Sequence, residues 1–208
     1  MLEIFQVPKT LADDLLEFSD RQDCYSLTEM EDLKTELSQY VGVYALYYRG
    51  ANPLYACISR ANSDRCCLPI YIGKAIASGR RTGRTQGRTS NLYNRLKENK
   101  KSIEKGDGLS VSEFEFKVVA MEVDLVSWGE GVMIRYFQPV WNQIIDGFGN
   151  HDPGRGRYQQ KRSVWDLLHP GREWAQKLTN FDPLDYTAIL DRVEALCLDS
   201  SQRVGCPT

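Results

Sequence analysis

GVYALYY (residues 42–48) and PIYIGK (residues 69–74) are the two stretches of this sequence that decide its fold. Both are rich in β-branched and aromatic residues over the length of a strand, which predicts two β-strands. Side chains alternate between the two faces of a strand, so Tyr44 and Tyr71 each point away from their neighbours in the strand. If the two strands pair, we expect the two phenols to stand together on one face of a sheet.

The rest of the chain is expected to place helices around these strands. Residues 110–123 alternate between apolar and polar side chains and predict a third strand. Residues 49–68 are expected to be loop-rich, with a short extra strand around residues 54–55, and the tail from residue 199 is expected to fray. Helices are predicted over residues 11–20, 27–39, about 91–105, from 124 or 127 to about 137, and from about 183 to 198.

Length and composition indicate either one large globular domain or one domain with extensions. The chain has 208 residues, of which 42% are hydrophobic and 26% charged, values that are ordinary for a soluble protein. No apolar run approaches the roughly 20 residues that a membrane span needs, and the N-terminus lacks the features of a signal peptide. We therefore expect no membrane association and a cytoplasmic location.

The cysteines have irregular spacings and include no C-x-x-C pair, which argues against a structural zinc site and against a disulfide scaffold. We expect buried or idle thiols. The six positions are Cys24, Cys57, Cys66, Cys67, Cys197 and Cys206.

The charges are distributed unevenly along the chain. Residues 1–40 hold ten acidic and three basic side chains, whereas residues 74–105 hold ten basic and two acidic ones. The acidic opening is either a partner-docking or DNA-mimicking arm or, as we favour, a solvated helical face that covers the sheet. The basic stretch of residues 74–105 is suited to binding an anion, because a guanidinium group can donate two hydrogen bonds to two oxygens of one phosphate.

Two segments are candidates for contact with nucleic acid. Residues 75–90 lack hydrophobic periodicity and acidic side chains, so we favour a phosphate-contacting loop over a merely solvated one. Residues 146–162 are polar, glycine-rich and basic, which indicates either disorder or function, and the side-chain types include those that read base edges. The candidate DNA-binding residues are Lys74, Arg80, Arg81, Arg84, Arg88, Asn150, His151, Arg155, Arg157, Gln159 and Arg162.

Two charged residues in predicted helices are candidates for catalysis. Arg95 shares a helical stripe with Asn91 and Asn99, although it could equally be one more exposed base on a basic helix. Glu130 lies between two glycines, which are costly inside a helix. The spacing Ser127-x-x-Glu130 also fits a capping box, and the pattern alone leaves both interpretations open.

Taken together, these residues resemble the GIY-YIG nucleases. GVY at 42–44 and YIG at 71–73, followed by Arg95, Glu130 and Asn142, stand in the order of that family's signature elements over residues 40–145. Further stretches resemble its type II restriction endonuclease branch, namely residues 43–48, 139–142, 146–151 and 169–174. One position departs from that branch: Asn99 stands where a histidine is usual, one helical turn after the arginine.

The resemblance implies an α+β fold, with a small three-stranded antiparallel sheet flanked by helices and extended by helices at both ends. It implies an N-terminal helical arm (1–40), a catalytic core (41–145) and a C-terminal DNA-contacting segment (146–208). Relatives of this kind are homodimers in the prokaryotic cytoplasm. They cut a GC-rich palindrome in double-stranded DNA with magnesium, for which manganese could substitute.

The resemblance also implies roles for individual residues. Glu130 would hold the metal ion, and Arg95 would stabilise the charge of the transition state. Tyr44 is the candidate base, with a pKa that we expect Arg95, Lys74 and the metal to lower. Tyr71 would orient water or phosphate. Asn142 and Asn99 would hydrogen-bond a phosphate or a neighbouring group.

Three other functions remain open at this point. A GIY-YIG nuclease of repair or mobile-element type would share the fold, but such enzymes usually carry a separate DNA-binding domain. A catalytically weak nucleic-acid-binding module is plausible because Asn99 cannot take a proton near neutral pH. A protein-interaction domain that uses the acidic arm would leave the arginine-rich loop unexplained.

Overall fold

A computed structural model describes residues 8–76 and 91–207, and it confirms an α+β fold built on a small antiparallel sheet. The sheet has the strand order β1-β4-β2-β3, and every neighbouring pair is antiparallel. The strands are β1 (Tyr25–Ser26), β2 (Gly42–Tyr48), β3 (Tyr71–Ala75) and β4 (Phe114–Ala120). The prediction of three strands was incomplete, because two residues of the acidic N-terminal segment pair with β4 and form a fourth, edge strand.

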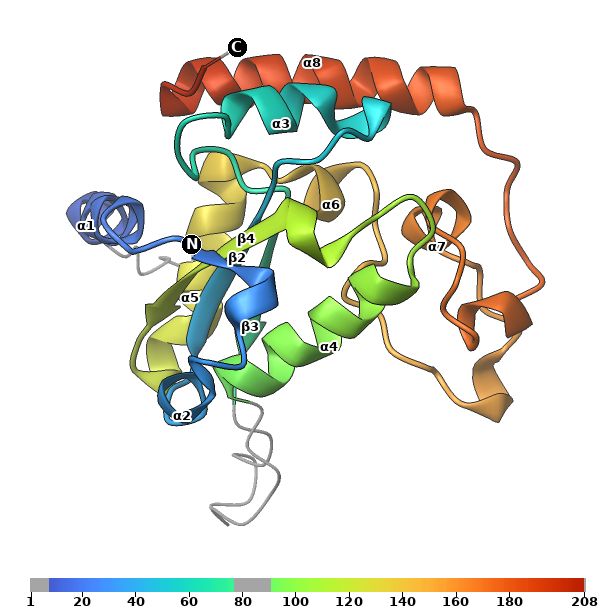
Figure 1. The fold of residues 1–208 in the computed structure, drawn as a ribbon, viewed down its shortest axis with the longest axis horizontal. Coiled ribbons are helices and arrows are strands. Elements are labelled where there is room, and N and C mark those ends of the chain that lie inside the picture. The colour runs from blue at the N-terminus through green and yellow to red at the C-terminus, as the bar shows by residue number, and fades with distance from the viewer. Residues whose placement is uncertain (1–7, 77–90, 208) are drawn as a thin grey trace, which may run out of the picture.

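Helices cover both faces of the sheet (Figure 1). Helix α4 (Leu92–Lys105) packs on the face that carries Tyr44 and Tyr71. Helix α5 (Val123–Phe137) packs on the opposite face, and the leucines of α1 (Lys9–Asp20) add to the same cluster. The N-terminal helix therefore closes one side of the core, as the helical-face interpretation of the acidic segment predicted.

The shorter helices correct several predicted boundaries. Residues 27–39 form two short helical turns instead of one helix, and residues 54–55 belong to a 3-10 turn that leads into α3, not to a strand. The remaining elements are η1 (Leu27–Glu29), α2 (Lys34–Leu37), η2 (Pro53–Tyr55), α3 (Ala56–Ala61), η4 (Val111–Glu113), α6 (Val140–Gln143), η5 (Arg155–Arg157), α7 (Val164–Leu168), η6 (Ala175–Lys177) and α8 (Tyr186–Val204).

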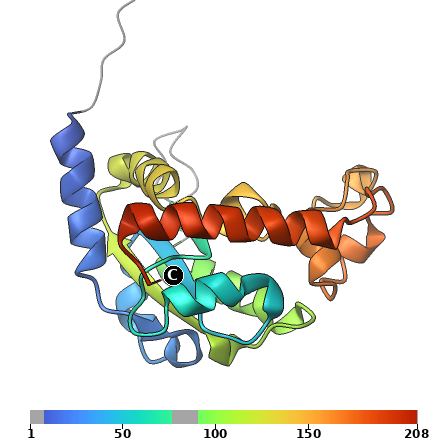
Figure 2. The same ribbon diagram turned by 90° about the horizontal axis from the view of Figure 1, so that it is seen from above.

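Helix α8 is longer than predicted and does not fray at residue 199. It begins after the cap Asp185, whose carboxylate accepts a hydrogen bond from the Ala188 amide, and it ends at Val204 with Gly205 in the left-handed region. It packs against α3 and runs from the region of α7 and η6 back over the core (Figure 2). None of the helices in residues 8–76 and 91–207 is long and apolar enough to cross a membrane.

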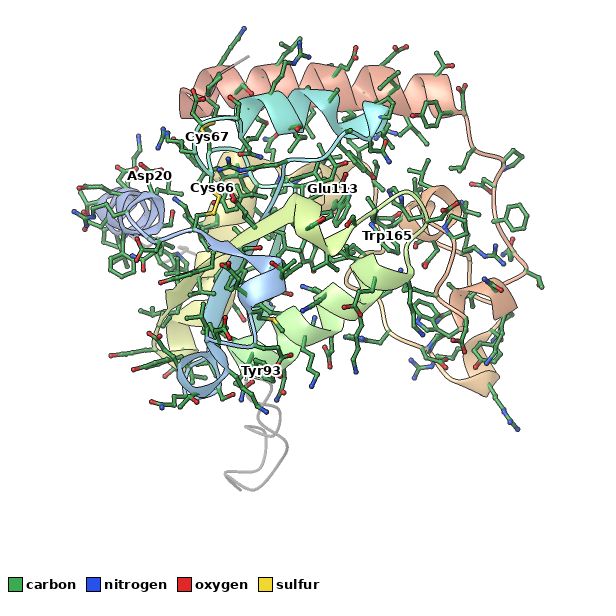
Figure 3. The ribbon with its side chains drawn as sticks, in the orientation of Figure 1. Asp20, Cys66, Cys67, Tyr93, Glu113 and Trp165 are labelled. Carbon is green, nitrogen blue, oxygen red and sulfur yellow. A yellow bond between two sulfur atoms is a disulfide. The ribbon has the colours of Figure 1, made fainter. Side chains whose placement is uncertain are left out.

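The expectation of idle thiols was wrong for four of the six cysteines. Cys24 is bonded to Cys66 and Cys67 to Cys206, and Cys66 and Cys67 lie next to each other before β3 (Figure 3). The first bond joins the N-terminal segment to this loop, and the second joins the loop to the end of α8. Sequence spacing could not reveal either pairing, because the partners are 42 and 139 residues apart.

The first glycine of the GVY motif is required by the sheet itself. A Cβ atom at Gly42 would lie 2.1 Å from the carbonyl oxygen of Val119 on the neighbouring strand β4. No side chain fits there without moving β4 away from β2. The glycine therefore lets the start of β2 sit tightly against β4, with Tyr44 two residues further on.

Candidate active site

Strand pairing brings the two predicted phenols together. Tyr44 lies opposite Gly73 in the β2–β3 register, and Tyr71 lies two residues away on the same face. Their ring centroids are 6.2 Å apart, and Tyr44 is fully buried while Tyr71 is almost so. The alternation of side chains in the two sequence runs therefore predicted this pair correctly.

The glycine of YIG makes room for these rings. A Cβ atom at Gly73 would lie 2.4 Å from the hydroxyl oxygen of Tyr44 and 2.9 Å from a ring carbon of Tyr71. The backbone of β3 is thus in direct contact with the phenol, and a methyl group would have to push it aside. By contrast, a Cβ at Gly131 in α5 would meet only the flexible end of Arg135, at 3.2 Å.

Replacing Gly73 with alanine is expected to displace the Tyr44 phenol and to lower the DNA cleavage that the resemblance implies by about 10²-fold, since misplacement of reacting groups by about 1 Å costs that much. Overpacking should also lower the free energy of unfolding by about 1–3 kcal/mol. Gly131→Ala is the matched control and should be neutral or stabilising by up to about 1 kcal/mol. Cleavage rates and denaturant unfolding measure both effects, and equal behaviour of the two variants would contradict the steric argument.

Helix α4 places two of the residues predicted for catalysis beside the phenols. Asn99 is buried and donates a hydrogen bond from Nδ2 to the Tyr44 hydroxyl at 2.8 Å. Arg95, one turn earlier, lies near enough for its positive charge to act on both tyrosines. The helix is capped by Asn91, whose side chain accepts a hydrogen bond from the Asn94 amide at 2.9 Å.

The C-terminal segment reaches the same place. His151 follows α6 and its loop, and its Nε2 lies 2.7 Å from a terminal nitrogen of Arg95. The same arginine nitrogen pairs with Glu98 at 2.7 Å. The loop also passes directly over Tyr71, because a Cβ at Gly149 would lie 2.6 Å from the Tyr71 hydroxyl.

Glu130 lies inside α5 and not in a helix cap. The helix begins at Val123 after Glu122, so the capping-box interpretation of Ser127 and Glu130 was wrong. One Glu130 oxygen lies 2.7 Å from Nζ of Lys74 at the end of β3. Glu130 and Tyr71 come from opposite faces of the sheet, yet they interact electrostatically, because β3 is the edge strand of the sheet.

Asn142 is attached to the free edge of β3. Its Oδ1 accepts from the Ile72 amide and its Nδ2 donates to the Ile72 carbonyl, both at 2.9 Å. The side chain thus imitates a neighbouring strand and occupies the unpaired backbone groups between Tyr71 and Gly73. In this arrangement the Asn142 side chain holds in place the strand that carries Tyr71.

The expected lowering of the tyrosine pKa was wrong for the protein alone. Burial raises the pKa of Tyr44, and the charge of Arg95 and the hydrogen bonds from Asn99, Tyr71 and Arg95 offset this only in part. Burial also raises the pKa of Tyr71, followed in importance by the neighbouring Tyr44. Both phenols are therefore neutral near pH 7.

The donor set at the edge of β3 suits a hard divalent cation. Glu130 offers a partly exposed carboxylate, and magnesium keeps several waters and needs only one or two protein carboxylates. A second cluster, formed by Cys24, Cys66 and Glu115, does not fit a metal. Its two sulfurs are joined in a disulfide, and Glu115 pairs with Arg49 at 2.8 Å.

The predicted DNA-binding residues fall into four groups. Lys74 pairs with the Glu130 carboxylate at 2.7 Å. The arginines at 80, 81, 84 and 88 lie outside the described residues. Arg162 donates to the carbonyls of Leu178 and Gln176 and so holds its own segment together. The side chains of the remaining loop residues are exposed, namely Asn150, His151, Arg155, Arg157 and Gln159.

Sequence reasoning missed Arg172, which holds the loop in place. This buried guanidinium pairs with Asp166 at 2.6 Å and donates to the carbonyls of Gly147, Phe148 and Asn150 at 2.8–3.2 Å. It also stacks against Trp165 (labelled in Figure 3), with the guanidinium carbon 4.5 Å from the ring centroid. A lone arginine between tryptophans in the sequence gave no sign of this role.

Comparison with known proteins gives a family for most of the chain. The family model described as Eco29kI GIY-YIG domain matches residues 36–197, which is most of the chain and includes all six residues predicted for catalysis. A search of curated proteins found no match.

Proposed function

The chain belongs to the Eco29kI GIY-YIG family of restriction endonucleases and is thus a nuclease, and we propose that it is a type II enzyme that cuts double-stranded DNA at a GC-rich palindrome. One observation carries this proposal. Tyr44 of β2, Tyr71 of β3, Arg95 of α4 and Glu130 of α5 gather around the edge strand β3, at the end where Lys74 lies. This arrangement supplies positive charge, neutral hydroxyls and a carboxylate to one phosphate.

We assign each group the step that its chemistry suits. Arg95 neutralises the charge that builds up on the phosphate oxygens in the transition state. Tyr71 orients the phosphate, while Asn142 fixes the strand that carries it. Glu130 would hold a divalent ion, which we propose to be magnesium and which would polarise the phosphate and stabilise the leaving oxygen.

Tyr44 is the base proposed from the sequence, but its raised pKa changes the form of this role. A neutral phenol is a poor proton acceptor near pH 7. The Tyr44 oxygen already accepts hydrogen bonds from Asn99, Tyr71 and Arg95, so its O–H is the group left to donate to a water. We therefore propose that Tyr44, held by Asn99, positions the attacking water. The proton of that water must then pass to another group.

Base readout is proposed for the exposed turn η5. Arg155 and Arg157 make no side-chain hydrogen bond or ion pair to any residue in the described part of the chain, and Gly154 and Gly156 leave open space around them. Arginine reads guanine through two parallel hydrogen bonds. A palindromic site would be bound by a homodimer, whose two-fold axis matches that of the DNA.

Arg155→Ala is expected to reduce discrimination against a wrong base pair by about 1–3 kcal/mol at one position of the site. Competitive binding to oligonucleotides with single substitutions measures this, with Arg157→Ala tested in parallel. Equal weakening on every sequence would show a phosphate contact instead of base readout.

The proposed function is tested by incubating plasmid DNA with the protein and magnesium, with EDTA as the metal-free control. We expect discrete fragments whose ends, read by run-off sequencing, share one GC-rich palindrome. A second candidate, a DNA-binding module with weak catalysis, is favoured by Asn99, because an amide cannot take a proton. DNA binding without any metal-dependent cleavage would support that alternative and overturn the first.

A further inference from the structure

His151 brings an imidazole, a side-chain type that acts as a general base in many enzymes, to this site. Its Nε2 lies 2.7 Å from a terminal nitrogen of Arg95. A guanidinium can only donate hydrogen bonds, so Nε2 is the acceptor and the imidazole is neutral in this contact. The proton on the ring is then at Nδ1, and the lone pair of Nε2 points to the residue that we assign to the phosphate.

The surroundings of His151 suit a proton acceptor. The carboxylate of Glu98 on α4 lies 4.0 Å from Nε2 and would stabilise an imidazolium. The positive charge of Arg95 would destabilise the imidazolium until a bound phosphate neutralises that charge. Asp152 follows on the same loop. The His151 side chain is 60% exposed, so water and substrate can reach it.

The backbone that carries His151 is held rigidly. Arg172 binds the carbonyls of Gly147, Phe148 and Asn150, and the Phe148 ring packs edge-on against Tyr71 with centroids 4.8 Å apart. The loop is therefore fixed both to the phenol and to the guanidinium. A side chain held in this way is placed for chemistry at the phosphate rather than for adaptable contact with base edges.

We propose that His151 is the general base of DNA cleavage, taking the role that Asn99 cannot fill; this rests on the proposed nuclease function. When a phosphate oxygen accepts the Arg95 N–H, Nε2 of His151 is freed. It removes a proton from the attacking water as the water oxygen bonds to phosphorus. The bond from phosphorus to the 3′ oxygen breaks, its electron pair leaves with that oxygen, and a solvent proton neutralises it.

The test compares wild type with His151→Gln, which keeps hydrogen bonding but cannot take up a proton near neutral pH. Single-turnover cleavage is measured at saturating DNA with magnesium over pH 5.5–9. The wild-type rate should fall toward the acidic end of this range, because a protonated imidazole cannot take the proton of the attacking water. The variant should be slower by about 10²–10⁴-fold at pH 7.5 and should lose this acidic limb, with metal-free DNA affinity within about threefold of wild type.

The chain offers an internal control because it has only two histidines. His169 is buried, donates from Nδ1 to the Asp107 carbonyl and accepts from Tyr55 at Nε2, and burial lowers its pKa. Loss of the acidic limb in His151→Gln would therefore assign that limb to His151 and not to His169. Added imidazole should also restore part of the activity of His151→Ala, which a purely structural role would not allow.

The proposal is overturned if His151→Gln keeps the wild-type single-turnover rate, or if it loses DNA affinity but keeps the rate and pH profile at saturation. The second result would make His151 a DNA contact only. Wild type that never cuts DNA would instead refute the proposed function, so the two failures are distinguishable. Unchanged melting temperature, expected for an exposed side chain, shows that each variant is folded.

Discussion

Glu130→Gln is expected to abolish most DNA cleavage while leaving the fold intact. The amide keeps the shape of the side chain but removes the carboxylate that pairs with Lys74 at the end of β3. Loss of metal-assisted charge stabilisation of about 4 kcal/mol corresponds to roughly 10³-fold in rate. The ion pair with Lys74 is partly exposed, so its loss should lower the free energy of unfolding by less than about 1 kcal/mol.

Helix α5 provides a matched control. Glu122 precedes the helix, is exposed and makes no side-chain capping hydrogen bond, so Glu122→Gln should cut as well as wild type. A titration of magnesium should show that the Glu130 variant is less active at every concentration, because a charged ligand has been removed. If Glu130→Gln cut at the wild-type rate, the assignment of the metal to this helix would have to be abandoned.

The core of the fold was predictable because its signals are local. Strand periodicity in residues 42–48 and 69–74 fixes which side chains share a face, and this alone placed Tyr44 beside Tyr71. The spacing of four residues between Arg95 and Asn99 likewise placed both on one side of α4. These predictions needed only the geometry of single elements and one assumption about pairing.

The missed features all depend on contacts between distant residues. Strand β1 is too short to give a pattern, and the cysteine pairs join segments 42 and 139 residues apart. The Asn142 side chain is hydrogen-bonded to the backbone of Ile72, 70 residues away in sequence, and His151 contacts Arg95, 56 residues away. The loop that carries His151 has no periodicity of its own, so its position follows from the groups that bind its carbonyls.

This dependence makes Arg172 the residue whose loss should do the most structural damage. Arg172→Met keeps much of the volume but leaves the Asp166 carboxylate, 1% exposed, without its cation. It also removes the donors to three loop carbonyls. Breaking a buried ion pair of this kind costs about 3–5 kcal/mol of unfolding free energy. The surface pair Arg21–Glu17, with both side chains more than half exposed, is the control, and Arg21→Met should cost less than about 1 kcal/mol.

A second substitution separates the ion pair from the loop. Asp166→Asn combined with Arg172→Met removes the uncompensated charge, so the double variant should be less destabilised than the sum of the two single variants. Its loop carbonyls remain without donors, however, and His151 loses its support. The double variant should therefore recover stability in denaturant unfolding without recovering single-turnover cleavage. Recovery of both would show that Arg172 serves the fold alone, and recovery of neither would show that the hydrogen bonds to the loop, and not the charge pair, dominate its contribution.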